Sequence, residues 1–189
     1  MEKIQELSSV EKRLVKDRIR DTALCLCQVL QDHSSSAVRY VPRGIFALAK
    51  TVQAHPLLRK EMLKDTHRQH VLASFRAAAS DSALYNNALD VSQVALAQTY
   101  LNVYCPEFWQ SISESCTTAW GTRAASTVVY AYGRLVERKL APDADEALIE
   151  TMFSTVMCNV ADMSACGVAN VAWSLAKQGL GFRHALQPL

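Results

Sequence analysis

The sequence lacks any hydrophobic run that could span a membrane. A spanning helix needs about 18 to 20 predominantly apolar residues, and charged residues interrupt every hydrophobic segment of this chain. We therefore expect no membrane insertion. The early acidic residues Glu2, Glu6 and Glu11 argue against a signal peptide or an uncleaved organellar transit sequence. A presequence that has already been removed stays open.

Metal-binding and disulfide motifs are also missing, although the chain has six cysteines. None of the cysteines forms a Cys-x-x-Cys pair, so we expect neither a zinc nor a disulfide framework. His67 and His70 are three residues apart with no carboxylate in metal-ligand register, so we expect no metal there. We expect reduced thiols inside helices, packed in the core, at the following positions: Cys25, Cys27, Cys105, Cys116, Cys158 and Cys166.

Glycine is scarce and charge is nearly balanced. The six glycines are scattered, and no phosphate-binding loop, dinucleotide fingerprint or Gly-x-Ser-x-Gly motif occurs. We therefore expect no cofactor and no enzymatic activity. The formal net charge of +2 is too small for the whole surface to attract nucleic acid. Any case for RNA binding must rest on where the cations lie.

No segment shows a convincing strand pattern, whereas apolar residues recur at helical spacing along the chain. Pro42, Pro56 and Pro106 suit the first turns of helices. With 50% hydrophobic residues in 189, the chain can bury a substantial core. We predict one all-α domain, residues 1–189, built from successive antiparallel helix pairs. Its expected parts are an amino-terminal helical segment (1–36), repeats (37–180) and a tail or start of a further repeat (181–189).

The stretch from Ser164 to Gly179 shows the clearest helical pattern. Val168, Val171 and Leu175 recur on one face, Ser164 can cap the amino end, and Gly179 follows as a helix stop. Three earlier segments can be aligned with its main part, 168–179: residues 41–52, 96–105 and 125–136. The mean period of roughly 42 residues falls in the range of helical-hairpin repeats, which predicts an α-solenoid of about four repeats.

The alignment defines a polar column that never holds an aliphatic residue: Arg43, Gln98, Thr127 and Asn170. Three residues further on, each segment has a large apolar residue: Phe46, Leu101, Tyr130 and Trp173. We expect Trp173 to be buried between the last helix pair and its neighbour. Trp109 and Trp120 are also expected in the core rather than as base-stacking platforms.

Stacked hairpins expose one helix position from every repeat along a common concave surface. Amides on such a surface can hydrogen-bond base edges, and cations can neutralise phosphates. Further cations and small or amide residues lie four positions before the polar column and four and seven positions after it. Together these positions predict RNA contacts at Arg39, Arg43, Lys50, Gln98, Asn102, Arg123, Thr127, Arg134, Asn170, Ser174 and Lys177. The alternatives are solubilising residues and, for Asn170, a hydrogen bond between repeats. The basic run at Lys12, Arg13 and Lys16 is better explained as a solvated helix face.

Residues 168–179, Val-Ala-Asn-Val-Ala-Trp-Ser-Leu-Ala-Lys-Gln-Gly, resemble the second helix of the octotricopeptide repeat. The segment Arg43-Gly-Ile-Phe-Ala-Leu-Ala-Lys50 keeps the aromatic residue and the Ala-Leu-Ala-Lys, and the two middle segments are looser. This repeat belongs to the heptatricopeptide group of organellar RNA-binding proteins. The resemblance implies an α-solenoid that works on mitochondrial or plastid RNA.

Two functions stay open at this point. The first is a non-catalytic RNA-binding protein. Four repeats that each read one base would select poorly among transcripts, so a protein that finds its RNA alone is not expected. We therefore expect a structural subunit of an organellar ribosome, mitochondrial rather than plastid, in contact with ribosomal RNA and neighbouring proteins. The alternative is a protein-binding scaffold of the same architecture, whose concave face holds a partner helix or peptide.

Overall fold

The computed structural model describes residues 9–33, 41–115, 120–142, 146–157 and 160–178. Within these ranges the chain is helical and contains no strand, which confirms the all-α prediction. None of the described helices is long and apolar enough to cross a bilayer. The helices are α1 (Ser9–His33), α2 (Val41–Ala54), α3 (Pro56–Met62), α4 (Asp65–Ala79), α5 (Ala88–Leu101), α6 (Pro106–Ser115), α7 (Thr122–Glu137), α8 (Glu146–Met157) and α9 (Ala165–Lys177), with short 3-10 turns at Ser82–Asn86 and Val160–Asp162.

Local sequence signals set the ends of several helices. Pro42, Pro56 and Pro106 lie in the first turns of α2, α3 and α6, where the missing proline N–H removes no helical bond. The Ser164 hydroxyl accepts from the Gly167 N–H at 3.1 Å and caps α9 as predicted. At α5 the cap is Asn87, whose amide oxygen accepts from the Leu89 N–H.

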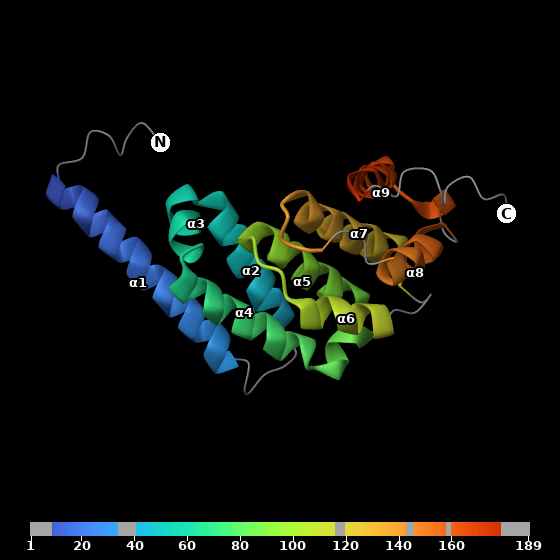
Figure 1. Ribbon diagram of the computed structural model, residues 1–189. Helices are drawn as coiled ribbons and strands as arrows, with labels where there is room; N and C mark the ends of the chain where they lie inside the picture. Colours follow the sequence, from blue (N-terminus) through green and yellow to red (C-terminus); the bar gives the residue numbers. More distant parts are fainter. Residues whose placement is uncertain (1–8, 34–40, 116–119, 143–145, 158–159, 179–189) are drawn as a thin grey trace.

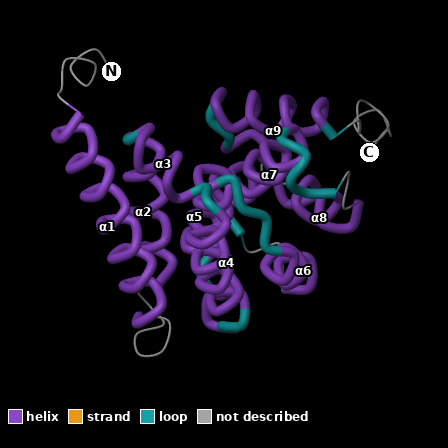
Figure 2. Tube along the Cα trace, turned by 60° about the vertical axis from the view of Figure 1, so that its left-hand side comes forward, coloured by secondary structure: helices purple, strands orange, loops and turns teal. Residues whose placement is uncertain are grey.

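The helices form two rows (Figures 1 and 2). In the first row α2 packs against α5, α5 against α7, and α7 against α9. In the second row α1 packs against α4, α4 against α6, and α6 against α8. Helix α3 connects α2 to α4 and contacts α1. Helices adjacent within the first row are therefore separated in sequence by a helix of the second row.

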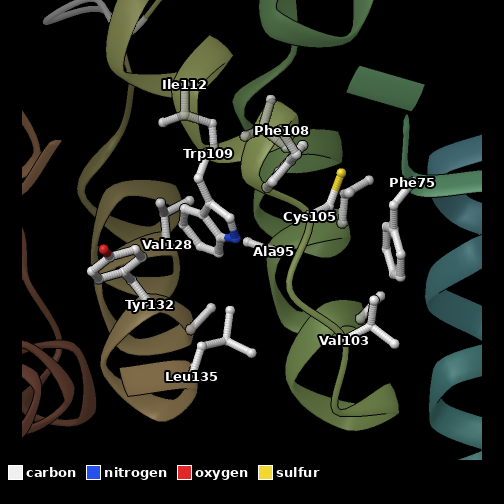
Figure 3. Packing of buried hydrophobic residues seen from close by; sticks show 14 of the residues in the cluster. Phe75, Ala95, Val103, Cys105, Phe108, Trp109, Ile112, Val128, Tyr132 and Leu135 are labelled. Atoms are coloured by element: carbon white, nitrogen blue, oxygen red, sulfur yellow. The ribbon is translucent and has the colours of Figure 1, made fainter. Parts of the chain in front are cut away.

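The core lies between the rows and is richest around α5, α6 and α7 (Figure 3). Trp109 of α6 is 1% exposed and makes edge-to-face contacts with Phe108 and Tyr132, at ring-centroid distances of 5.4 and 5.1 Å. The Gln98 amide oxygen accepts from the Trp109 indole N–H at 3.1 Å and from the Cys105 N–H at 2.9 Å. Gln98 thereby joins α5 to the start of α6 inside the core. Trp120 is buried too, so the core prediction is confirmed for these two tryptophans.

Helices α7 and α9 approach closely at a glycine. A Cβ atom on Gly133 would lie 2.7 Å from the Ser174 hydroxyl oxygen and 3.0 Å from the Ser174 Cα. The second of these atoms is backbone, so rotation of the serine side chain cannot relieve the contact. The small residue at this position is therefore required by the packing of the two helices.

We predict that Gly133→Ala destabilises the protein by about 1 to 3 kcal/mol, because the new methyl group forces α7 and α9 apart. The matched control is Gly44→Ala in α2, where a Cβ atom meets nothing within 4 Å. Helix propensity alone should make that variant more stable by about 0.5 to 1 kcal/mol. Denaturant unfolding measures both, and a stabilised Gly133→Ala variant would contradict the close approach.

Candidate nucleic-acid interface

Four half-buried aromatic residues lie along the first row of helices, one on each: Phe46, Tyr100, Tyr130 and Trp173. We call them the aromatic row. The rings of Phe46 and Tyr100 stack at a centroid distance of 6.3 Å, and those of Tyr130 and Trp173 lie 5.6 Å apart. Because α5 packs against α7, the two pairs lie on neighbouring helices. Burial raises the pKa of Tyr100, and Tyr130 raises it further. The row therefore crosses α2, α5, α7 and α9.

The aromatic row corrects the sequence alignment at α5. We expected Leu101 in the column of Phe46, Tyr130 and Trp173, but the structure places Tyr100 there. A shift of one residue turns a helix by about 100°. Gln98 thus points into the core, where it is 0% exposed, and the prediction that it contacts RNA is wrong. The sequence signal for the correct alignment was the aromatic side chain of Tyr100, directly before Leu101.

Three cations lie over the rings of the aromatic row. The Lys50 ammonium is 5.5 Å from the centroid of Phe46, while the Arg134 guanidinium and the Lys177 ammonium are 5.4 and 5.8 Å from that of Trp173. Each cation follows the ring residue of its own helix by four positions, so both project from the same face. We call Lys50, Arg134 and Lys177 the basic band. All three were predicted as RNA contacts, and the structure brings them to one face of the first row.

Two further arginines, which the sequence analysis missed, lie beside the basic band. Arg138 donates to the Thr99 carbonyl and to the Asn102 side-chain oxygen, both near the end of α5. Burial lowers the pKa of the Arg138 guanidinium, and the positive charges of Arg134 and Arg59 lower it further. Arg59, Arg134 and Arg138 are therefore close enough for their positive charges to repel one another. Only the chain fold brings Arg59 close to the other two, because it lies on a short helix outside the aligned segments.

Asn102, which was predicted to contact a base, has a structural role at the end of α5. Its backbone is left-handed, with φ of 50°, and it ends α5. Asparagine tolerates this conformation better than most residues do. Its side-chain oxygen already accepts from Arg138. Asn102 therefore fixes the end of α5 and the position of Arg138.

A carboxylate interrupts the basic band. The two oxygens of Glu137 lie 3.0 Å from an Arg134 nitrogen and 3.0 Å from the Lys177 ammonium, so this residue of α7 bridges to α9. The side chain is 31% exposed. Glu137 competes with any anion that approaches these two cations. The sequence signal for this ion pair was the spacing of three residues between Arg134 and Glu137.

The remaining predicted contacts differ in their accessibility. Arg43 is exposed and forms an ion pair with Asp90 at 3.8 Å, and Arg123 is exposed. Thr127 donates to the Arg123 carbonyl at 2.7 Å, which satisfies its hydroxyl within the helix. Asn170 is half-buried, with its amide nitrogen 3.8 Å from the sulfur of Cys166. Arg39 lies outside the described residues.

Ser174 was predicted to contact RNA, and this prediction is wrong. Its side chain is 0% exposed and packs against Gly133 at the crossing of α7 and α9. Gln98 is buried because α5 has a neighbour on each side in the row, α2 and α7, whereas Ser174 is buried because it faces α7 where the two helices approach closely. The polar column of the sequence is therefore not a continuous surface.

The cysteines also depart from expectation. Cys105 is buried, and burial raises its pKa to about 11, so it stays a thiol. Cys25 and Cys166 are exposed, so the prediction of core thiols is wrong for these two. The side chains of Cys27, Cys116 and Cys158 lie outside the described residues.

The histidine pair contains one buried member. His67 is 4% exposed, with its Nε2 3.6 Å from a carboxylate oxygen of Glu61, whereas His70 is half-buried. Across the described part of the chain, no group of three or more His, Cys, Asp or Glu side chains is placed to hold a metal ion.

Trp173 is half-buried, so its predicted burial is wrong. Because its ring contacts Tyr130 and two cations rather than the core, we expect Trp173→Ala to cost only about 1 to 2 kcal/mol. Trp109→Ala, at a site 1% exposed, should cost about 3 to 5 kcal/mol through the cavity that it leaves. Chemical denaturation of both variants tests the difference. Equal losses would place Trp173 in the core after all.

Comparison with protein-family models, with curated proteins and with solved structures finds no match for this chain. The case for its function therefore rests on the geometry of the basic band and the aromatic row, together with the resemblance of residues 168–179 to an octotricopeptide helix.

Proposed function

We propose that this protein is a non-catalytic RNA-binding α-solenoid of four helical hairpins. The hairpins would be α1 with α2, α4 with α5, α6 with α7, and α8 with α9, and α3 would be an insertion. The two rows support this division, because each hairpin contributes one helix to each row. A regular stack of this kind presents equivalent positions along one extended surface.

The observation that carries the proposal is the basic band over the aromatic row. Cations held against ring faces are partly ordered before a ligand arrives, so less side-chain entropy is lost when they contact phosphates. Lys50 and Lys177 lie on the first and last helices of the row, with Arg134 on a helix between them. The charges thus follow the direction in which an RNA backbone would cross the helices.

We infer that the RNA belongs to a larger assembly. Of the polar column, Gln98 is buried and Thr127 is bonded to its own helix, so few amides remain to read base edges. Phosphate contacts position a protein on RNA without selecting a sequence. This favours a structural subunit of a mitochondrial ribosome or related ribonucleoprotein, with ribosomal RNA and neighbouring proteins as partners. A plastid ribosome is the alternative location.

The proposal predicts a specific dependence on salt. Replacing Lys50, Arg134 and Lys177 with alanine removes three phosphate contacts and leaves the buried core untouched. The slope of log affinity against log salt on single-stranded RNA should then fall by roughly 0.7 per lost contact, about 2 in total. Filter binding or fluorescence anisotropy across a salt series measures it.

The control removes equal charge from Arg18, Arg20 and Arg68, which are exposed and lie outside the first row. It should leave the slope nearly unchanged. Loss of RNA binding in the control but not in the basic-band variant would place the RNA surface elsewhere. Wild-type protein without salt-dependent RNA binding would favour the protein-binding scaffold, whose apolar interface should be insensitive to salt.

Glu137 provides an independent test in the opposite direction. Because its carboxylate occupies Arg134 and Lys177, Glu137→Gln should free both cations and strengthen RNA binding by roughly 1 kcal/mol, about fivefold. Glu150→Gln, an exposed position on α8 in the second row, is the matched control for the change in net charge. Equal gains in the two variants would show that only the overall charge matters and would count against a local site.

A further inference from the structure

A cleft of about 410 Å³ lies between α1 and α3, and it shares no residue with the basic band. Its volume is within the usual range for small-molecule sites, roughly 300 to 1,000 Å³. The cleft is lined by four lysines, three aliphatic residues and one glutamate: Lys12, Lys16, Lys60, Lys64, Val15, Ile19, Leu57 and Glu61.

The lining combines two kinds of surface. Val15 and Ile19 of α1 and Leu57 of α3 provide an apolar part. Lysines stand on both walls, Lys12 and Lys16 on one, Lys60 and Lys64 on the other, each pair four residues apart. Lys12 and Lys16 are therefore on one side of α1, whereas Lys60 is on α3 and Lys64 follows the end of that helix. The run at Lys12 and Lys16, interpreted from sequence as a solvated face, is thus one wall of a cleft.

Glu61 holds part of this arrangement in place. It is 7% exposed, and its carboxylate oxygens lie 2.7 and 2.6 Å from the Lys64 ammonium. The hydrogen bond from Lys64 is the main cause that lowers the pKa of Glu61, and His67 also lowers it. The carboxylate therefore stays ionised near neutral pH and orients Lys64. The lining side chains carry four positive charges and one negative charge, a formal excess of three.

We propose that this cleft binds a phosphomonoester that carries an apolar body, with the phosphate between the lysine walls and the body against Val15, Ile19 and Leu57. The charge of the cleft favours this group, because a phosphomonoester carries close to two negative charges at neutral pH and a carboxylate only one. The aliphatic lining gives no advantage to free phosphate. A nucleoside monophosphate and the phosphate headgroup of a lipid share this chemistry.

The proposal is tested by calorimetric titration of the whole chain with four probes: octyl phosphate, adenosine monophosphate, octanoate and inorganic phosphate. Octyl phosphate or adenosine monophosphate should bind at one saturable site, at least about tenfold more tightly than octanoate or inorganic phosphate. Tighter binding of the nucleotide identifies a nucleotide source, and tighter binding of octyl phosphate a lipid source. Equal affinity for octanoate, or no saturable binding of either phosphomonoester, overturns the proposal.

Variants locate the site. Lys16→Ala with Lys60→Ala removes one cation from each wall and should weaken phosphomonoester binding by about tenfold or more. Arg18→Ala with Arg68→Ala, exposed positions outside the cleft, should change nothing. Leu57→Ser should weaken binding of octyl phosphate and leave inorganic phosphate unaffected. Circular dichroism checks that each variant is folded, and unchanged affinity in the double lysine variant assigns the ligand to another site and overturns the proposal.

Discussion

The arrangement of the two helical rows depends on one buried amide. The Gln98 side chain of α5 points into the core, where its oxygen accepts both the Cys105 backbone N–H and the indole N–H of Trp109. These donors lie where the chain passes from the first row to the second. Without the amide both would be buried and unpaired, which costs about 1 to 3 kcal/mol each. The polar residue that seemed suited to RNA instead connects the rows.

The two rows place functional side chains on the outside of a tightly packed first row. Close approach at Gly133 brings α9 against α7, and this contact brings Trp173 next to Tyr130. The tryptophan ring then supports cations from both helices. An exposed cation over an aromatic ring gains only about 0.5 to 1 kcal/mol, enough to orient a side chain without preventing it from contacting a phosphate. Helix packing and the proposed RNA surface are therefore coupled through a single ring.

The modest net charge conceals two separate concentrations of positive charge. The basic band lies on the first row, with Arg138 and Arg59 of α3 near Arg134, and the four lysines of the cleft lie between α1 and α3. Each contains one carboxylate, Glu137 in the first and Glu61 in the second, and these two differ in burial. The exposed Glu137 can be displaced by a competing anion, whereas the buried Glu61 is held by Lys64 and His67. The first surface suits a long polyanion and the second a small one.

The sequence by itself determined the helical class, most helix boundaries and the cations of the basic band. The local signals are helical spacing, prolines in first turns and the Ser164 cap. Helices α2, α7 and α9 each have a polar stripe, which shows which side of the helix faces outward. Helix α5 has no such stripe, because α2 and α7 flank it in the row and Gln98 is bonded to Trp109 of α6 in the second row. The periodicity of α5 could not decide whether Tyr100 or Leu101 is equivalent to Phe46. The burial of Gln98 was therefore decided only by tertiary packing. The same holds for Ser174 against Gly133, for Glu137 between two cations and for the cleft between α1 and α3, since each joins residues from different helices.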